Sequence, residues 1–152
     1  MSKQIIIKEK ELSLRKQCIP DIPNHETQVK DINILFLDNH DSHYKREIQK
    51  KIYNYTKQDE RKKRESNLCF DTILEKIISS KLRCSYCKKE VFILYKHAYD
   101  PKQWTLDRID NNIGHTYENC VISCYSCNKE KRIQSDMHFR QGKQFTFIQI
   151  GK

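Results

Sequence analysis

Residues 106–128 of this chain read LDRIDNNIGHTYENCVISCYSCN and contain two kinds of candidate metal ligand. Asp107 stands near the start of the stretch, and a Cys-x-x-Cys pair stands at its end, followed at once by Asn128. A second Cys-x-x-Cys pair lies upstream, and together the pairs comprise Cys84, Cys87, Cys124 and Cys127. Two such pairs supply the four thiolates of a tetrahedral zinc site that has no open position for a substrate. We therefore expect one structural zinc ion, held by these four cysteines.

The composition is that of a basic chain with a small hydrophobic core. Of the 152 residues, 37% are hydrophobic and 32% are charged, and the mean hydropathy is −0.86. This length fits one small domain with an extension. No apolar run is long enough to span a membrane or to form a secretory signal. We therefore expect a soluble, intracellular protein of the cytoplasm or nucleus.

The formal net charge is +9 at pH 7. A basic surface favours polyanionic partners such as nucleic acid, because bound phosphates release counterions. An AT-rich coding sequence produces the same charge without selection for binding, since Lys, Ile and Asn are all frequent here. The charge therefore makes DNA a candidate partner without establishing it.

Seven cysteines in an intracellular chain are more typical of metal binding than of disulfides, and an odd number argues against a closed disulfide framework. Three of them lie outside the Cys-x-x-Cys pairs. Cys120 is close enough to Cys124 to compete as a ligand, but its apolar run CVIS favours a buried free thiol. Cys18 and Cys69 have no partner at ligand spacing, so we expect free thiols there as well.

Hydrophobic spacing predicts both helices and strands. Residues 1–40 show little regular pattern, apart from an apolar run at 33–38 that could be a strand or a docking segment. Helical spacing predicts a short helix at 71–82 and an amphipathic helix within 41–65. The second helix could be a solvated packing helix, a DNA-binding arm or both. The remaining predicted elements are strands at 91–95, 104–109 and 120–123 and a helix at 127–133.

Four strings, in order, resemble the HNH endonuclease family, also called His-Me finger or ββα-metal nucleases, in its zinc-bound form. They are CSYC, WTLDRIDN, GHTYENCVIS and CYSCNKEK, and the resemblance covers roughly residues 81–132, about a third of the chain. It implies a small ββα-metal (HNH) finger stabilised by the four-cysteine zinc site. Charge and helical spacing predict a mainly helical, basic N-terminal extension before it, so the expected fold class is α+β. The expected parts are residues 1–65 as this extension and candidate DNA-binding arm, 66–140 as the nuclease domain, and 141–152 as a C-terminal tail or strand.

The resemblance also implies roles for single residues. Asp107 corresponds to the metal-binding acid at the end of the first strand, and Asn119 to the residue that fixes the loop between the strands. Asn128 corresponds to the residue that completes the catalytic cation site. A carboxylate and a carboxamide oxygen suit Mg²⁺ or Mn²⁺ rather than zinc. The implied activity is metal-dependent hydrolysis of DNA phosphodiester bonds, in an enzyme of the small stand-alone kind carried by viruses and mobile elements. These residues do not distinguish DNA from RNA.

Arg108 departs from the family pattern, because the family usually has a histidine there that acts as general base. Arginine stays protonated at neutral pH and cannot accept a proton. Either His115 or His97 is then the base, or water bound to the cation loses its proton to solvent while Arg108 clamps the phosphate. The alternative function is a catalytically inactive, zinc-stabilised nucleic-acid-binding module.

The candidate site residues also have simpler interpretations. Asp107 and Asp110 could flank Arg108 in a surface ion-pair network that contributes little to stability. His115 lies on a polar loop and could be only solvated. Asn119 would fix its loop in an active or an inactive protein.

Overall fold

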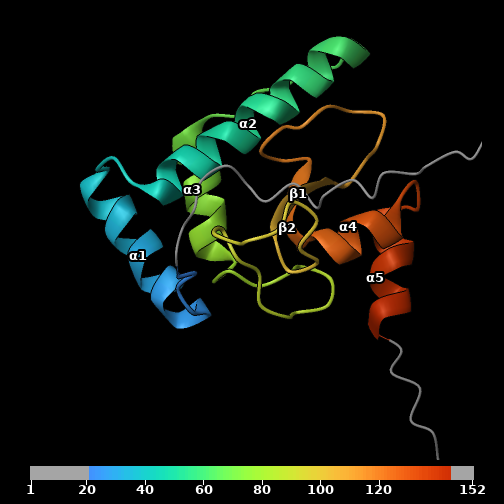
Figure 1. Ribbon diagram of the computed structural model, residues 1–152. Helices are drawn as coiled ribbons and strands as arrows, with labels where there is room; N and C mark the ends of the chain where they lie inside the picture. The colour runs from blue at the N-terminus through green and yellow to red at the C-terminus, as the bar shows by residue number, and fades with distance from the viewer. Residues whose placement is uncertain (1–20, 145–152) are drawn as a thin grey trace, which may run out of the picture.

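An antiparallel hairpin of β1 (Trp104–Arg108) and β2 (Cys120–Cys124) lies at the centre of the structure (Figure 1). The computed structural model describes residues 21–144, so the expectation for Cys18 lies outside the described part of the chain. Within this part the predicted α+β class is confirmed, with one two-stranded sheet and five helices: α1 (His25–Asp38), α2 (His43–Lys62), α3 (Phe70–Ser79), α4 (Tyr125–Lys131) and α5 (Asp136–Gln144). None of these five helices is long and apolar enough to cross a membrane.

The hairpin leads directly into α4. The register of its strands runs from Trp104 opposite Cys124 to Arg108 opposite Cys120. The ends of both strands lie within one residue of those predicted, 104–109 and 120–123. Cys124 both ends β2 and caps α4, and its sulfur accepts the N–H of Cys127 at 3.3 Å. Because this cap starts the helix early, α4 begins two residues before the predicted 127–133 segment. It packs on both strands.

The N-terminal helices form an apolar layer beside the hairpin. In Figure 1, α1 and α3 lie on one side of the hairpin and α4 and α5 on the other. α3 contacts α1, α2 and β2, and it buries the face formed by Ile73, Leu74 and Ile77. The predicted 71–82 helix stops at Ser79 because the chain turns at residues 81 and 82, which have φ angles of +53° and +51°.

α2 is the amphipathic helix predicted within 41–65. Its N-cap is Ser42, whose hydroxyl accepts the N–H of Lys45 at 3.2 Å. Tyr44 and Ile48 are buried, and Ile52 packs against the same core. The helix therefore buries one stripe, as the solvated packing helix requires.

Polar side chains on one face of α2 also form hydrogen bonds with the outer edge of β1 and with the loop that follows it. The side chains of Lys51, Tyr55 and Asp59 bond, in that order, to the carbonyl of Trp104, the N–H of Leu106 at 3.2 Å and the N–H of His115 at 2.7 Å. The three side chains follow one another at intervals of about one turn, so α2 lies along the hairpin and satisfies backbone groups at its edge. The predicted boundary at residue 65 stays a prediction, as does the boundary at 140, which falls inside α5.

The apolar run at 33–38, expected to be a strand or a docking segment, is helical. It forms the second half of α1, which begins after Asn24, whose side chain accepts the N–H of Thr27 at 2.9 Å. Ile32 and Leu35 are buried on one face of this helix. A short apolar run does not by itself distinguish strand from helix, and the cap upstream decides the outcome.

The strand predicted at 91–95 is also wrong, because the run finds no neighbouring strand. Phe92 makes a single bridge with Gln103, and the segment is otherwise irregular. The buried side chain of Gln28, from α1, takes the place of a strand. Its carboxamide oxygen accepts the N–H groups of Ile93 at 2.9 Å and Leu94 at 3.1 Å, and its nitrogen donates to the Leu94 carbonyl at 3.1 Å. One side chain thus satisfies three buried backbone groups.

Candidate metal centre

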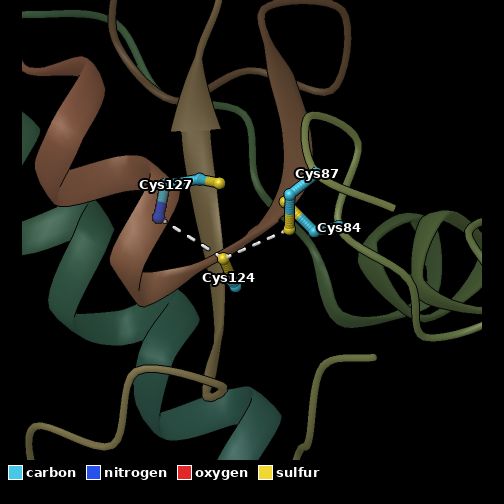
Figure 2. Close-up of side chains that lie close together, drawn as sticks. All are labelled: Cys84, Cys87, Cys124 and Cys127. Carbon is cyan, nitrogen blue, oxygen red and sulfur yellow. Dashed lines mark hydrogen bonds between the residues drawn. The ribbon is translucent and has the colours of Figure 1, made fainter. Parts of the chain in front are cut away.

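The four cysteines of the two Cys-x-x-Cys pairs converge at one point. Their sulfur atoms all lie within 4.8 Å of one another, and Figure 2 shows the two pairs turned toward each other. Three of the cysteines are buried and Cys87 is half-buried. The predicted set is therefore assembled, and it could hold a metal ion such as zinc.

Each pair is shaped by a backbone N–H that donates to a cysteine sulfur. The N–H of Tyr86 donates to Cys84 Sγ at 3.4 Å, and the cap of α4 supplies the equivalent bond to Cys124. The first turn closes with a bond from Lys88 N–H to the Cys84 carbonyl at 3.0 Å, and Lys88 has a φ of +63°. Bonds of this kind favour the thiolate form that binds metal.

The spacing of the sulfurs fits zinc. Tetrahedral Zn–S bonds of about 2.3 Å place sulfurs about 3.8 Å apart, and Cys87 Sγ lies 3.9 Å from Cys124 Sγ. Hydrogen bonds with Cys124 and Cys127 lower the pKa of the Cys84 thiol, whereas the same bonding raises the pKa of Cys127. Four thiolates this close repel one another, and a dication removes that repulsion.

The remaining sulfur and histidine candidates of the described residues lie outside this cluster. Cys120 is buried, and burial raises the pKa of its thiol to about 12, in agreement with an inert free thiol. Cys69 is an exposed free thiol at the N-cap of α3, and a hydrogen bond with Thr72 lowers its pKa. His97 is exposed and does not belong to the cysteine cluster.

Asp107 lies in a buried polar network rather than in a surface ion-pair network with Arg108. Its Oδ2 atom accepts the hydroxyl of Tyr86 at 2.5 Å and lies 3.1 Å from Nζ of Lys131. The Tyr86 hydroxyl also lies 3.0 Å from Asp136 Oδ1, on α5. Tyr86 stands between the two cysteines of the first pair. The turn that positions these cysteines therefore also holds Asp107, through the Tyr86 hydroxyl.

Lys131 is a site residue whose partner the sequence patterns did not reveal. Its side chain is 0% exposed, and its ammonium group also donates to the backbone carbonyl of Arg108 at 2.5 Å. Lysine is almost never fully buried unless it is paired. The available signal was its position three residues after Asn128, which places both on one face of α4. Nothing in the sequence paired Lys131 with Asp107.

Arg108 holds the loop between the strands. Its guanidinium donates to the carbonyls of Asn111 at 3.1 Å and Ile113 at 3.2 Å. These bonds brace residues 109–114 against the end of β1. The predicted phosphate contact of Arg108 stays a prediction, since a guanidinium has further N–H groups to donate.

Asn119 ties together the two ends of the same loop. Its side-chain oxygen accepts the N–H of Asp110 at 2.9 Å, and its nitrogen donates to the carbonyls of Asp110 at 2.9 Å and Gly114 at 3.0 Å. Gly114 is required by close packing, because a Cβ there would lie 1.9 Å from the carbonyl oxygen of Glu65. The loop-fixing geometry expected for Asn119 is present.

His115 is buried, so the interpretation as a solvated loop residue is wrong. Its ring stacks on Tyr55 with centroids 4.5 Å apart, and its Nδ1 lies 2.9 Å from Asp59 Oδ2. Asp59 therefore orients the ring and ties the loop to the end of α2. Burial lowers the pKa of His115, and the hydrogen bond with Asp59 opposes that shift. Its predicted role as general base stays a prediction.

Asn128 lies on the face of α4 that packs on β1. Its side-chain nitrogen donates to the hydroxyl of Thr105 at 3.2 Å, while the carbonyl and hydroxyl of Ser123 engage the same Thr105 hydroxyl. Side chains alternate across a strand, so Thr105 and Asp107 point to the same face of the hairpin. The structure therefore brings Asn128 and Asp107 to one face.

No family model, curated protein or solved structure matches this chain.

Zinc removal tests the cysteine cluster. We expect elemental analysis to find about one zinc per chain, and a strong chelator to unfold the protein, because the metal ion cross-links two distant segments. Circular dichroism follows the unfolding. Cys84→Ser should lose the zinc, whereas Cys69→Ser, at an exposed cysteine outside the cluster, should keep it. Retention of full zinc content by Cys84→Ser would contradict the assignment.

The pH dependence of stability tests the buried state of His115. A lowered pKa means that the folded state favours the neutral ring, so this stabilisation is present above the unfolded pKa of about 6.5 and is lost as the pH falls through the folded pKa. Urea unfolding between about pH 7.5 and 5.5 should show this loss. His115→Asn keeps a donor for Asp59 and should lose less stability over the same range. His138→Asn, at an exposed position, should behave like the wild type, and equal slopes for all three proteins would contradict the account.

Proposed function

We propose that this protein is a metal-dependent endonuclease that hydrolyses DNA phosphodiester bonds. The observation that carries the proposal is the placement of Asp107 and Asn128. Asn128 binds Thr105 and Lys131 binds Asp107, so that residues one turn apart on α4 contact alternate residues of β1. The predicted carboxylate and carboxamide ligands thus share one face of a hairpin that a separate cysteine cluster supports. Such division of labour suits a structural zinc ion and a second, open cation site.

The order of elements supports the same proposal. A hairpin, a loop tied by an asparagine, a Cys-x-x-Cys turn and a helix that begins within that turn follow one another. This is the order that the HNH resemblance implies, and we propose that the hairpin and α4 form its ββα-metal finger. The net charge of +9 suits a DNA substrate. The same resemblance implies a virus or a mobile element as its source.

The proposed second ion is Mg²⁺ or Mn²⁺, since the ligands are oxygens. When bound, such an ion would polarise the scissile phosphate and activate a water molecule. Asp107 Oδ2 already has two donors, but a carboxylate has about four acceptor positions on two oxygens. Lys131 and Tyr86 hold the carboxylate in one orientation and leave positions for a cation.

The chain's own residues supply charge and order rather than an obvious base. Arg108 cannot accept a proton, and His115 is 3% exposed with one ring nitrogen engaged by Asp59. We therefore propose that the attacking water loses its proton to solvent. Arg108, half-buried at the end of β1, then offers its remaining N–H groups to the phosphate.

One observation favours the alternative, a zinc-stabilised nucleic-acid-binding module without catalysis. The ammonium of Lys131 already supplies a positive charge at Asp107, as the bound cation of an enzyme would. A binding module of this kind needs no Mg²⁺ for DNA affinity. It should bind DNA with a strong salt dependence and leave the strands intact.

Plasmid nicking tests the proposed activity. Supercoiled plasmid incubated with the zinc-loaded protein and Mg²⁺ or Mn²⁺ should become nicked or linear. Asp107→Asn and Asn128→Ala should each reduce the rate by at least about 100-fold, because each removes a ligand of the proposed cation. Gel electrophoresis measures the conversion.

Controls separate catalysis from folding. Breaking a buried ion pair costs about 3–5 kcal/mol, and Asp107→Asn leaves Lys131 without a charged partner. Asn128→Ala leaves that pair intact and therefore serves as the second variant. Glu118→Gln removes an exposed carboxylate from the loop between β1 and β2, and this variant should nick DNA like the wild type. Absence of nicking with both metals, or nicking at the wild-type rate by folded Asn128→Ala and folded Asp107→Asn, would refute the proposal.

A further inference from the structure

A groove runs between α2 and α4, beside β1. Its volume is about 390 Å³. One wall is formed by α2, with Asn54, and the other by the start of α4, with Tyr125 and Lys129, while Thr105 of β1 contributes to the lining. Asn128, the proposed cation ligand, also lines it. The groove therefore reaches the candidate site from the side of the N-terminal helices.

The two walls are fixed relative to each other. α2 is bonded to the edge of β1 through Lys51 and Tyr55, both of which line the groove. Lys51 also donates to the side chain of Gln103 at 3.0 Å. The opposite wall is held by the cysteine cluster at the start of α4. A groove between two anchored elements needs little ordering when a ligand binds.

The lining is suited to an anion. Among the described residues, eight side chains line the groove, and none of them carries a negative charge. Two are lysines, and all eight have a hydrogen-bond donor: ammonium, amide or hydroxyl. α2 itself carries seven basic and three acidic residues, and two of these acids, Glu47 and Asp59, are buried. Phosphodiester oxygens accept hydrogen bonds from such groups, and most protein contacts to nucleic acid are of this kind.

We propose that this groove binds the phosphodiester backbone of a nucleic-acid strand beside the cut position, with Asn54 and Lys129 as contacts from opposite walls. Both side chains are exposed. The inference rests on the proposed function for the role of Asn128 at the cut. It makes α2 part of the substrate-binding surface, which the resemblance alone, confined to residues 81–132, does not reach.

Binding is measured separately from cleavage, with zinc-loaded full-length protein and no added Mg²⁺ or Mn²⁺. Fluorescence anisotropy reports the affinity for three labelled probes: a short DNA duplex, the same single-stranded DNA and the matching RNA. The double variant Asn54→Asp/Lys129→Glu places repulsive charge on both walls. Its matched control, Asn33→Asp/Lys30→Glu, makes the same charge change on exposed residues of α1.

We expect the groove variant to bind the preferred probe roughly 10- to 100-fold more weakly, because it loses hydrogen bonds to charged groups. The α1 control should change affinity by less than about threefold, since distant surface charges are screened by salt. Lys129→Ala should also reduce the slope of log affinity against log salt by about 1. The probe that responds most identifies the substrate as duplex DNA, single-stranded DNA or RNA.

The proposed role of the groove is refuted if the two double variants bind the probes with equal affinity, or if the wild type binds none of the probes. The proposed function fails in a different way. Groove-dependent binding without plasmid nicking would support the proposed binding by the groove and refute the nuclease activity, so that the protein would be a binding module. Nicking by the groove variant with unchanged affinity would refute the proposed binding by the groove and support the nuclease activity.

Discussion

The meeting of two Cys-x-x-Cys turns is the constraint on which the rest of the structure depends. The cluster joins segments separated by 36 residues, and its sulfurs lie within 4.8 Å of one another. Those 36 residues contain β1, the loop between the strands and all of β2 except Cys124, so a metal ion held by the cluster would close the hairpin at its base. The same cluster starts α4, because Cys124 is both ligand candidate and N-cap. A small core of this kind gains much of its stability from such a clamp.

Residues next to the four cysteines in the sequence connect the cluster to the candidate catalytic residues. Tyr86, inside the first turn, bonds to Asp107, and Asn128 directly follows the second turn. Loss of zinc should therefore disturb the proposed cation site even though no cysteine belongs to it. Lys131 completes the connection, since a buried ammonium holds both the Asp107 carboxylate and the end of β1. The two proposed metal sites are distinct in chemistry and linked by position.

Local patterns in the sequence were enough for the hairpin and α2, because each depends on spacing within a short stretch, and the two Cys-x-x-Cys pairs were enough for the cysteine cluster. The loop-fixing bonds of Asn119 were expected from the resemblance. Local patterns failed where one side chain satisfies a distant segment. Gln28 replaces a strand for residues 93 and 94, more than sixty positions away. Asp59 likewise forms hydrogen bonds with the buried His115, 56 positions away, and Lys131 pairs with Asp107. A single sequence does not show which distant residue a polar side chain will contact once both are buried.

The central claim is that Asp107 and Asn128 hold a second cation, separate from the cysteine cluster. Titration of zinc-loaded protein with Mn²⁺, followed by the paramagnetic resonance signal of the free ion, tests it directly. The account predicts one saturable Mn²⁺ site per chain, lost in Asp107→Asn and in Asn128→Ala and kept in Glu118→Gln. Absence of a saturable site, or equal uptake by the wild type and both folded variants, would contradict it.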